Sequence, residues 1–184
     1  MHTSDIIGQI DTPLGVVPIL CSTASSKLAG LVLTKEYSKK NVSNEQWSVD
    51  QVDLYKLTIT VSEFCLLITL GTGRIVHDES YAESGQFFDS IRFEKDELLM
   101  HVGTHDGEAV NIGLPNRIQR PDEGFDLVKY NKSGDIVISV APLQTSETIE
   151  LYFSVAWKLN PQPEELSTWF AADFALPGPI FKSA

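Results

Sequence analysis

The feature that most constrains this chain is an alternation of apolar and polar residues with a period of two. It is clearest in TIELYFSVAWK, residues 148–158. The apolar positions are Ile149, Leu151, Phe153, Val155 and Trp157, and the intervening positions are Thr148, Glu150, Tyr152, Ser154 and Lys158. Because successive side chains of a strand point to opposite faces, this pattern predicts a half-buried antiparallel strand. LYKLTITV repeats it, and Leu57, Ile59 and Val61 are expected to face inward.

Turn residues between such segments predict hairpins. The segments FFDSIRF and LLMHV flank the charged turn EKDE, and FDLVKY and DIVISV flank NKSG. A third pair, DLYKLTITV and FCLLITL, is joined by Ser62-Glu63. Further strands are expected over Ile6 to Ile10, Val16 to Cys21, Leu28 to Lys35 and Glu108 to Ile112. Roughly ten short strands with regularly spaced turns predict an all-β, mainly antiparallel sandwich or open barrel.

One short helix is expected within residues 163–176. Pro163 suits a first helical turn, Glu164 and Glu165 favour the positive end of the helix dipole, and Pro177-Gly178-Pro179 ends the segment. An apolar stripe at helical spacing is formed by Leu166, Trp169, Phe170 and Phe174, with Asp173 interrupting it. This stripe predicts a short amphipathic helix packed on the sheet. By contrast, KKNVSNEQWSVDQ lacks apolar periodicity and is expected to be a loop with at most one helical turn.

Length and composition indicate one globular domain spanning residues 1–184, because no repeat, low-complexity stretch or linker divides the chain. The beginning of the chain lacks a basic stretch followed by an apolar one, and the apolar runs are far shorter than the ~20 residues of a membrane helix. We therefore expect a soluble cytoplasmic protein. Cys21 and Cys65 lie in apolar runs and are expected to be reduced core thiols, although a bridge between them stays open.

The formal net charge of −11 disfavours nucleic acids and anionic membranes as partners, because both attract basic surfaces. The acidic excess is concentrated between Asp78 and Asp135. This part of the chain is expected to project a negative potential. General solubility and recognition of a basic partner are both compatible with it.

The stretch LLMHVGTHDGEAVNIG contains two histidines and an aspartate that could bind a metal ion. We expect His101 on a strand, with His105 and Asp106 in a Gly103 to Gly107 turn. Four-residue spacing suits a helix face better than a strand entering a turn, so the turn interpretation is favoured and no cofactor is predicted. A metal site at His101, His105 and Asp106 stays an alternative, which a distant ligand such as His77 with Asp78 would strengthen.

Catalytic motifs give little support for an enzyme. LGTGRIVHDE lacks the third glycine of a dinucleotide fingerprint and the Gly-Lys-Ser/Thr of a mononucleotide loop, so a tight turn is expected there. There is no Gly-x-Ser-x-Gly elbow, and the cysteines lack a polar setting. We therefore predict no catalytic residues.

The stretch HDESYAESGQFFDS, which resembles a long loop entering a strand, is the best candidate for recognition. It combines acidic side chains, which steer a basic partner, with aromatic ones, which anchor interfaces. The expected partner-binding residues are Asp78, Glu79, Tyr81, Glu83 and Phe87. A solvated loop whose phenylalanines turn into the core is the competing interpretation.

Together these patterns favour a non-enzymatic acidic protein that binds and neutralises a more basic protein, as an inhibitor or toxin-immunity protein does. One alternative is a sandwich or barrel that binds a small ligand or metal, with hydrolytic or cupin-like chemistry. Another is a subunit of a larger protein assembly, with strand edges and Trp169-Phe170 as contacts.

Overall fold

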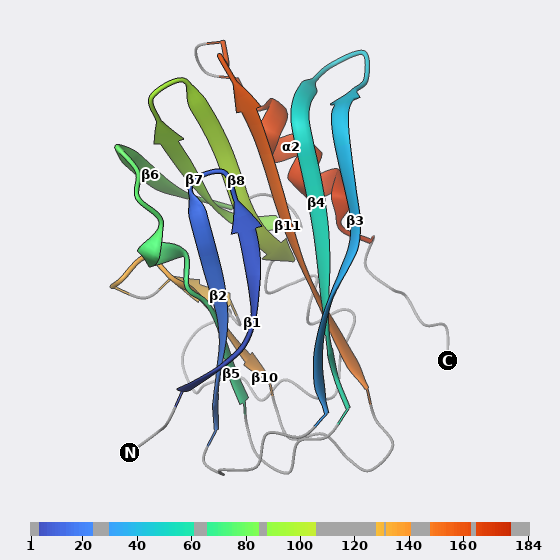
Figure 1. Ribbon diagram of the computed structural model, residues 1–184, viewed down its shortest axis with the longest axis vertical. Coiled ribbons are helices and arrows are strands. Elements are labelled where there is room, and N and C mark those ends of the chain that lie inside the picture. The colour runs from blue at the N-terminus through green and yellow to red at the C-terminus, as the bar shows by residue number, and fades with distance from the viewer. Residues whose placement is uncertain are drawn as a thin grey trace.

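A computed structural model describes residues 4–23, 30–60, 66–84, 88–105, 128–130, 132–140, 148–162 and 165–177. In these residues two antiparallel sheets face each other as a sandwich, and one short helix covers part of the second sheet (Figure 1). The prediction of a mainly antiparallel all-β fold with a short C-terminal helix is confirmed, and the arrangement is a sandwich.

The first sheet has five strands in the order β1-β2-β5-β10-β9. Their bounds are β1 Ser4–Thr12, β2 Gly15–Thr23, β5 Leu66–Leu70, β9 Val128–Tyr130 and β10 Ile136–Val140. A 3₁₀ turn, η1 (Thr72–Arg74), follows β5 where a tight turn is expected. There Asp135 accepts a hydrogen bond from the Gly73 amide at 2.9 Å, and a Cβ on Gly73 would lie 1.8 Å from the Ser133 carbonyl oxygen.

The second sheet has six strands in the order β3-β4-β11-β8-β7-β6. Their bounds are β3 Leu31–Ser43, β4 Ser48–Ile59, β6 Glu79–Ser84, β7 Phe88–Lys95, β8 Leu98–His105 and β11 Ile149–Leu159. Every pair of neighbouring strands is antiparallel. The central strand β11 therefore joins two hairpins, β3-β4 and β7-β8, into one sheet.

The main core lies between the two sheets and follows the alternation seen in the sequence. In β11 the apolar positions from Ile149 to Val155 are buried, and Trp157 packs partly against the same cluster. In β4 the inward positions Leu57 and Ile59 are fully buried, as predicted, while Val61 lies outside the described residues. Burial of this apolar surface is the main driving force for the two-sheet arrangement.

The helix α2 (Ser167–Ala175) packs on the face of the second sheet that points away from the first sheet (Figure 1). Its buried residues are Ser167, Thr168, Ala171 and Ala172. The predicted apolar stripe is wrong, because Leu166, Phe170 and Phe174 are exposed and only Trp169 is half-buried. Small side chains let the helix approach the sheet closely, so the larger ones point outward.

This helix also changes the polar side of β11. Ser154, expected on the polar face, and Ala156 beside it are buried together with Val52 and Leu54 of the neighbouring strand β4. The strand is therefore buried on both faces at its centre. Alternation alone predicts one covered face, and it contains no information about a helix added from elsewhere in the chain.

Two of the three predicted hairpins are present. β7 pairs with β8 around Asp96-Glu97, and β9 pairs with β10. The third hairpin, joined by Ser62-Glu63, is wrong, since β4 belongs to the second sheet and β5 to the first. Both strands point one apolar face into the same core, which is equally compatible with a hairpin and with a crossing between facing sheets.

The prediction of a loop between Lys39 and Gln51 is also wrong. β3 continues to Ser43 and β4 begins at Ser48, so only the turn between them is irregular. In that turn the Asn44 side-chain oxygen accepts hydrogen bonds from the backbone amides of Gln46 and Trp47, both at 2.8 Å. These strand ends escaped prediction because β3 is polar and exposed over most of its length.

Other expectations fall partly outside the described residues. Cys21 is fully buried and free, and burial raises the pKa of its thiol to about 11. Cys65 and the strand predicted over Glu108 to Ile112 lie outside the described residues. Within the described residues, no helix has the length and apolar character needed to cross a membrane.

Candidate partner-binding edge

Glu79–Ser84 of the predicted recognition segment forms β6, the last strand of the second sheet, and the segment ends in β7, which begins at Phe88. Among the described residues β6 pairs only with β7, from Glu79 opposite Glu94 to Ser84 opposite Asp89. The loop expected here is therefore wrong, and the acidic residues lie on an edge strand. Polar residues on both faces of β6 hide its alternation, which is why sequence pattern did not predict a strand.

The two faces of β6 differ in chemistry. Opposite residues of paired strands share a face. Ser80 and Ala82 lie opposite the buried Phe93 and Ile91, so they continue the inner face of the sheet with small side chains. The outer face carries Glu79, Tyr81 and Glu83. Tyr81 is 50% exposed and its hydroxyl donates a hydrogen bond to the Glu79 carboxylate, which raises the pKa of the phenol.

On the outer face, the Glu83 side chain points away from the sheet edge toward His101 on β8. Its Oε2 lies 2.8 Å from His101 Nε2, and Oε1 lies 3.6 Å from an Arg92 guanidinium nitrogen. His101 is fully buried, and its Nδ1 lies 2.8 Å from the hydroxyl of Thr168 in α2. One polar chain therefore runs from the edge strand, across two strands, to the helix.

The protonation states of His101 and Glu83 in this polar chain follow from burial and from the hydrogen bond between them. Burial lowers the pKa of His101 despite the nearby Glu83, so the imidazole is neutral near pH 7. The hydrogen bond from His101 lowers the pKa of Glu83, which is ionised. Because a carboxylate only accepts, Nε2 carries the proton and donates to Glu83, and Nδ1 accepts from the Thr168 hydroxyl.

A cluster of carboxylates lies at the other end of β6. Glu94 binds Arg92, with its Oε1 at 2.6 Å from one terminal nitrogen of the guanidinium and 2.8 Å from Nε. Asp78 accepts a hydrogen bond from the Asp96 amide at 3.1 Å. The carboxylates that gather here are Asp78, Glu79, Glu94, Asp96 and Glu97. Arg92 is shared between Glu83 and Glu94, so this end keeps a negative charge.

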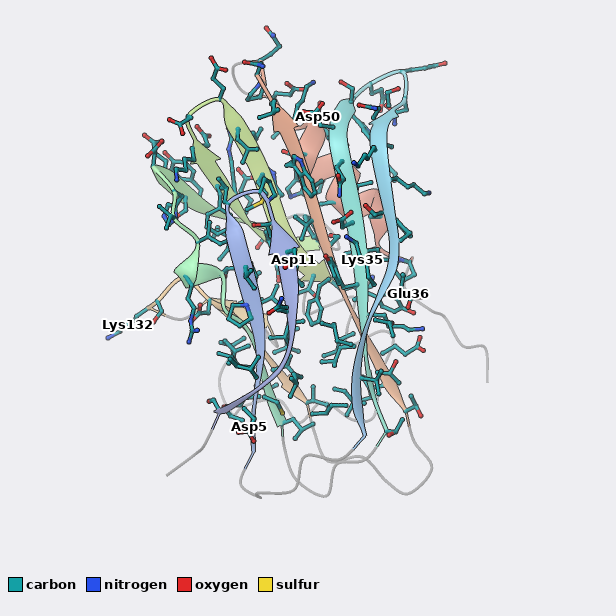
Figure 2. All side chains as sticks on the ribbon, viewed as in Figure 1. Asp5, Asp11, Lys35, Glu36, Asp50 and Lys132 are labelled. Atoms are coloured by element: carbon teal, nitrogen blue, oxygen red, sulfur yellow. The ribbon has the colours of Figure 1, made fainter. Side chains whose placement is uncertain are left out.

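The four edges of the two sheets are not equivalent in the described residues. β1 and β3 each carry a register shift, between Ile6 and Gly8 and between Lys35 and Tyr37. These two edges also approach each other, since a Cβ on Gly8 would lie 2.5 Å from Leu33 Cδ2. Figure 2 labels charged residues along both edges: Asp5 and Asp11 on β1, and Lys35 and Glu36 on β3.

β9 spans three residues, whereas β6 pairs over six positions without any register shift. Bulges, short length and charge are the devices that keep edges from pairing with other strands. Of these three devices, β6 has only its charged side chains to protect the edge. It is the most regular edge in the described part of the chain.

The histidine turn is placed differently from the prediction. β8 continues through His105, so the turn expected to begin at Gly103 is wrong. A Cβ on Gly103 would lie 2.4 Å from the Asp89 carbonyl oxygen and 2.6 Å from the Phe88 ring, so close packing, rather than a turn, requires this glycine.

The metal candidates are also separated in their contacts. His105 Nε2 lies 2.8 Å from the Pro177 carbonyl oxygen, whereas both ring nitrogens of His101 bind Glu83 and Thr168. Asp106 lies outside the described residues. In the described part of the chain, no three His, Cys, Asp or Glu side chains are arranged to hold a metal ion.

The predicted site residues therefore have different surroundings. Asp78, Glu79 and Tyr81 lie together on an exposed edge, Glu83 is drawn into the polar chain, and Phe87 lies outside the described residues. Sequence analysis missed Arg92, Glu94 and Thr168. The FFDSIRF hairpin register could have indicated Arg92 and Glu94, but no sequence signal places Thr168 beside His101.

Compared with protein-family models, curated proteins and solved structures, the chain matches none of them.

Proposed function

We propose that this protein is a non-enzymatic interaction domain that binds a basic protein through the acidic edge formed by Asp78, Glu79 and Tyr81. The observation that carries the proposal is the regular, exposed edge strand β6 with a surplus of carboxylates at its beginning. Charge steers a basic partner toward such an edge, and the exposed tyrosine supplies contact area.

The charge surplus favours a cationic partner over a neutral one. Arg92 is held by Glu94 and Glu83, and Lys95 is the other basic residue of β7. The carboxylates of Asp78, Glu79 and Asp96 are exposed, so they keep their hydration until a partner arrives. Exposed charges of this kind raise association rates more than they raise affinity.

Binding at this edge would cover a basic surface of the partner. If that surface binds nucleic acid, membrane or another protein, the complex blocks it. An inhibitor or immunity protein acts in this way, and this protein needs no catalytic residue for that role. The acidic composition of the whole chain supports the same proposal, since the formal net charge is −11.

The experiment is a pull-down from the source lysate with the full chain as bait, comparing the native sequence with Glu79→Lys. We expect a basic protein in stoichiometric amount, lost in Glu79→Lys and weakened by raising the salt concentration. Glu45→Lys is the matched control, because Glu45 lies exposed in the β3-β4 turn at the opposite edge of the same sheet. Equal capture by both variants, or no salt dependence, contradicts the proposal.

A further inference from the structure

We infer that β6 binds its partner by strand addition: an extended segment of the partner pairs antiparallel with β6, apolar side chains inward and basic side chains at its C-terminal end. This inference rests on the proposed function, and it specifies the partner's backbone and sequence pattern. The observation behind it is a six-residue edge in perfect register, with a small-residue inner face and an acidic beginning.

Backbone geometry supports pairing. An edge strand leaves alternate N–H and C=O groups without a ladder partner, and an added strand satisfies them. β1 and β3 carry bulges that interrupt such a template, whereas β6 has none. Since every neighbouring pair in the second sheet is antiparallel, the added strand is expected to continue that pattern.

The inner face of β6 selects apolar residues. Ser80, Ala82 and Ser84 are exposed, and the residues opposite the first two, Phe93 and Ile91, are buried core residues. Small side chains at an edge leave room beside this core. Val or Ile side chains of an added strand, placed opposite Ser80, Ala82 and Ser84, would extend the core by one strand.

The outer face selects the direction of the added strand. Glu83 is already bonded to His101 and shares Arg92 with Glu94, so a cation opposite Glu83 gains little. Glu79 and Asp78, by contrast, are exposed and close to further carboxylates. In an antiparallel pair the residues opposite Glu79 and Asp78 lie at the C-terminal end of the added strand. The cations therefore belong there.

Two other occupants fit less well. A second copy of β6 in antiparallel pairing would bring Glu79 opposite Glu83, and like charges directly opposite each other are destabilising. The segment 106–127 of the same chain has more acidic than basic side chains. Both would place negative charge against negative charge, which a basic partner avoids.

The test is an NMR titration of the full chain with a blocked peptide, Val-Thr-Val-Thr-Val-Lys-Lys, following the backbone amides of residues 79–84. The control is the same composition in reverse order, Lys-Lys-Val-Thr-Val-Thr-Val, which places the cations beside Glu83 in an antiparallel pair. We expect the dissociation constant of the control to be several-fold larger. In Glu79→Lys the difference should disappear.

Methylation of backbone nitrogens separates pairing from charge. Two further peptides carry N-methyl groups on alternate residues, one set on the odd and one on the even positions. In a strand paired with β6, the backbone N–H groups of one set point toward β6. Methylation of that set should weaken binding by about tenfold through lost hydrogen bonds, while methylation of the other set should have little effect. If both methylated peptides bind as well as the parent, strand addition is wrong, whereas the acidic-edge proposal stands.

The remaining outcomes are also decisive. Equal affinity of the forward and reverse peptides overturns the antiparallel direction, and no amide shifts at millimolar peptide overturn strand addition. Neither result touches the pull-down, in which equal capture by Glu79→Lys and Glu45→Lys, or no salt dependence, contradicts the proposed function. A solution mass of a dimer, lost in Ala82→Pro, would show that a second copy occupies the edge and would overturn the inference.

Discussion

His101 on β8 donates a hydrogen bond to Glu83 on β6 over 2.8 Å, and the His101 side chain is fully buried while that of Glu83 is partly exposed. The imidazole is the centre of a chain that ends at Thr168 in α2. It therefore joins the proposed binding edge to the only helix longer than one turn in the described residues. Two hydrogen bonds of one imidazole thus link two strands and a helix.

Replacing members of this chain should destabilise the fold in a graded way. His101→Ala leaves Glu83 and Thr168 without their shared partner and opens a cavity, so we expect a loss of about 2 to 4 kcal/mol. Thr168→Val keeps the shape but leaves Nδ1 of His101 unsatisfied, for about 1 to 2 kcal/mol. Urea unfolding monitored by tryptophan fluorescence measures both values.

Thr58→Val on β4 is the control for the threonine variant, because Thr58 is half-buried and lies outside this chain. Its effect should stay within about 0.5 kcal/mol. A Thr168→Val protein as stable as the native sequence would contradict the hydrogen bond to His101.

Acid should weaken the fold beginning near the ordinary pKa of histidine, 6.5. The folded pKa of His101 lies below that value, so below pH 6.5 the unfolded chain binds more protons than the native one and the free energy of unfolding decreases. The ordinary pKa of glutamate is 4.5, and that of Glu83 is lowered in the folded protein, which adds a second loss below pH 4.5. Arg92 and Glu94 also face the imidazole and have opposite effects on its pKa.

The measurement is the free energy of unfolding from pH 8 to pH 4, compared with His101→Gln. Glutamine cannot be protonated, so the difference between the two proteins should shrink as the pH falls from 6.5 toward 5. Parallel curves for the two proteins would show that His101 is not the group that titrates.

The face of α2 that packs on the sheet can be tested with two substitutions. Ala172→Leu introduces three carbon atoms into a fully buried position, and overpacking should cost about 1 to 3 kcal/mol. Phe174→Ser removes a side chain that is 68% exposed, so the loss should be below about 1 kcal/mol despite its stacking with Trp47 at 6.1 Å. Thermal unfolding compares them, and the opposite order would favour the aromatic stripe predicted from the sequence.

The buried thiol of Cys21 should resist alkylation. Its pKa is raised to about 11 by burial, with a smaller contribution from Asp5, and the thiolate is the reactive form. With iodoacetamide at pH 8, peptide mass spectrometry should find Cys21 unmodified in the native protein and modified in urea. Rapid labelling under native conditions would show that β2 opens locally.

Much of the fold follows from the sequence because its strands alternate strongly. The inward positions of β11, the β7-β8 hairpin and the β9-β10 hairpin were all predicted from period and turn residues. β6 was not, because Ser80, Ala82 and Ser84 on one face and Glu79, Tyr81 and Glu83 on the other are all compatible with a solvated loop. Its strand character depends on pairing with β7, which is a property of the folded sheet.

The predicted orientation of α2 on the sheet was wrong for a related reason. Hydrophobicity alone predicts that Trp169, Phe170 and Phe174 face the sheet. The small side chains of Ala171 and Ala172 let the helix lie closer to the sheet, and they occupy the buried face instead. The same contact explains the burial of Ser154 and His101. Neither residue type predicts it, since the helix arrives from a segment far along the chain.

The order of the strands determines how this protein can fold. The first sheet takes strands from the beginning, middle and later parts of the chain, and the second sheet takes the segments between them. In the second sheet β4 pairs with β11 and places Ile59 opposite Ile149, and in the first sheet β2 pairs with β5 across the whole β3-β4 hairpin. Both sheets therefore depend on pairing between segments that are far apart in the sequence. Such non-local pairing slows the search for the native state, so refolding in milliseconds to seconds, rather than microseconds, is expected.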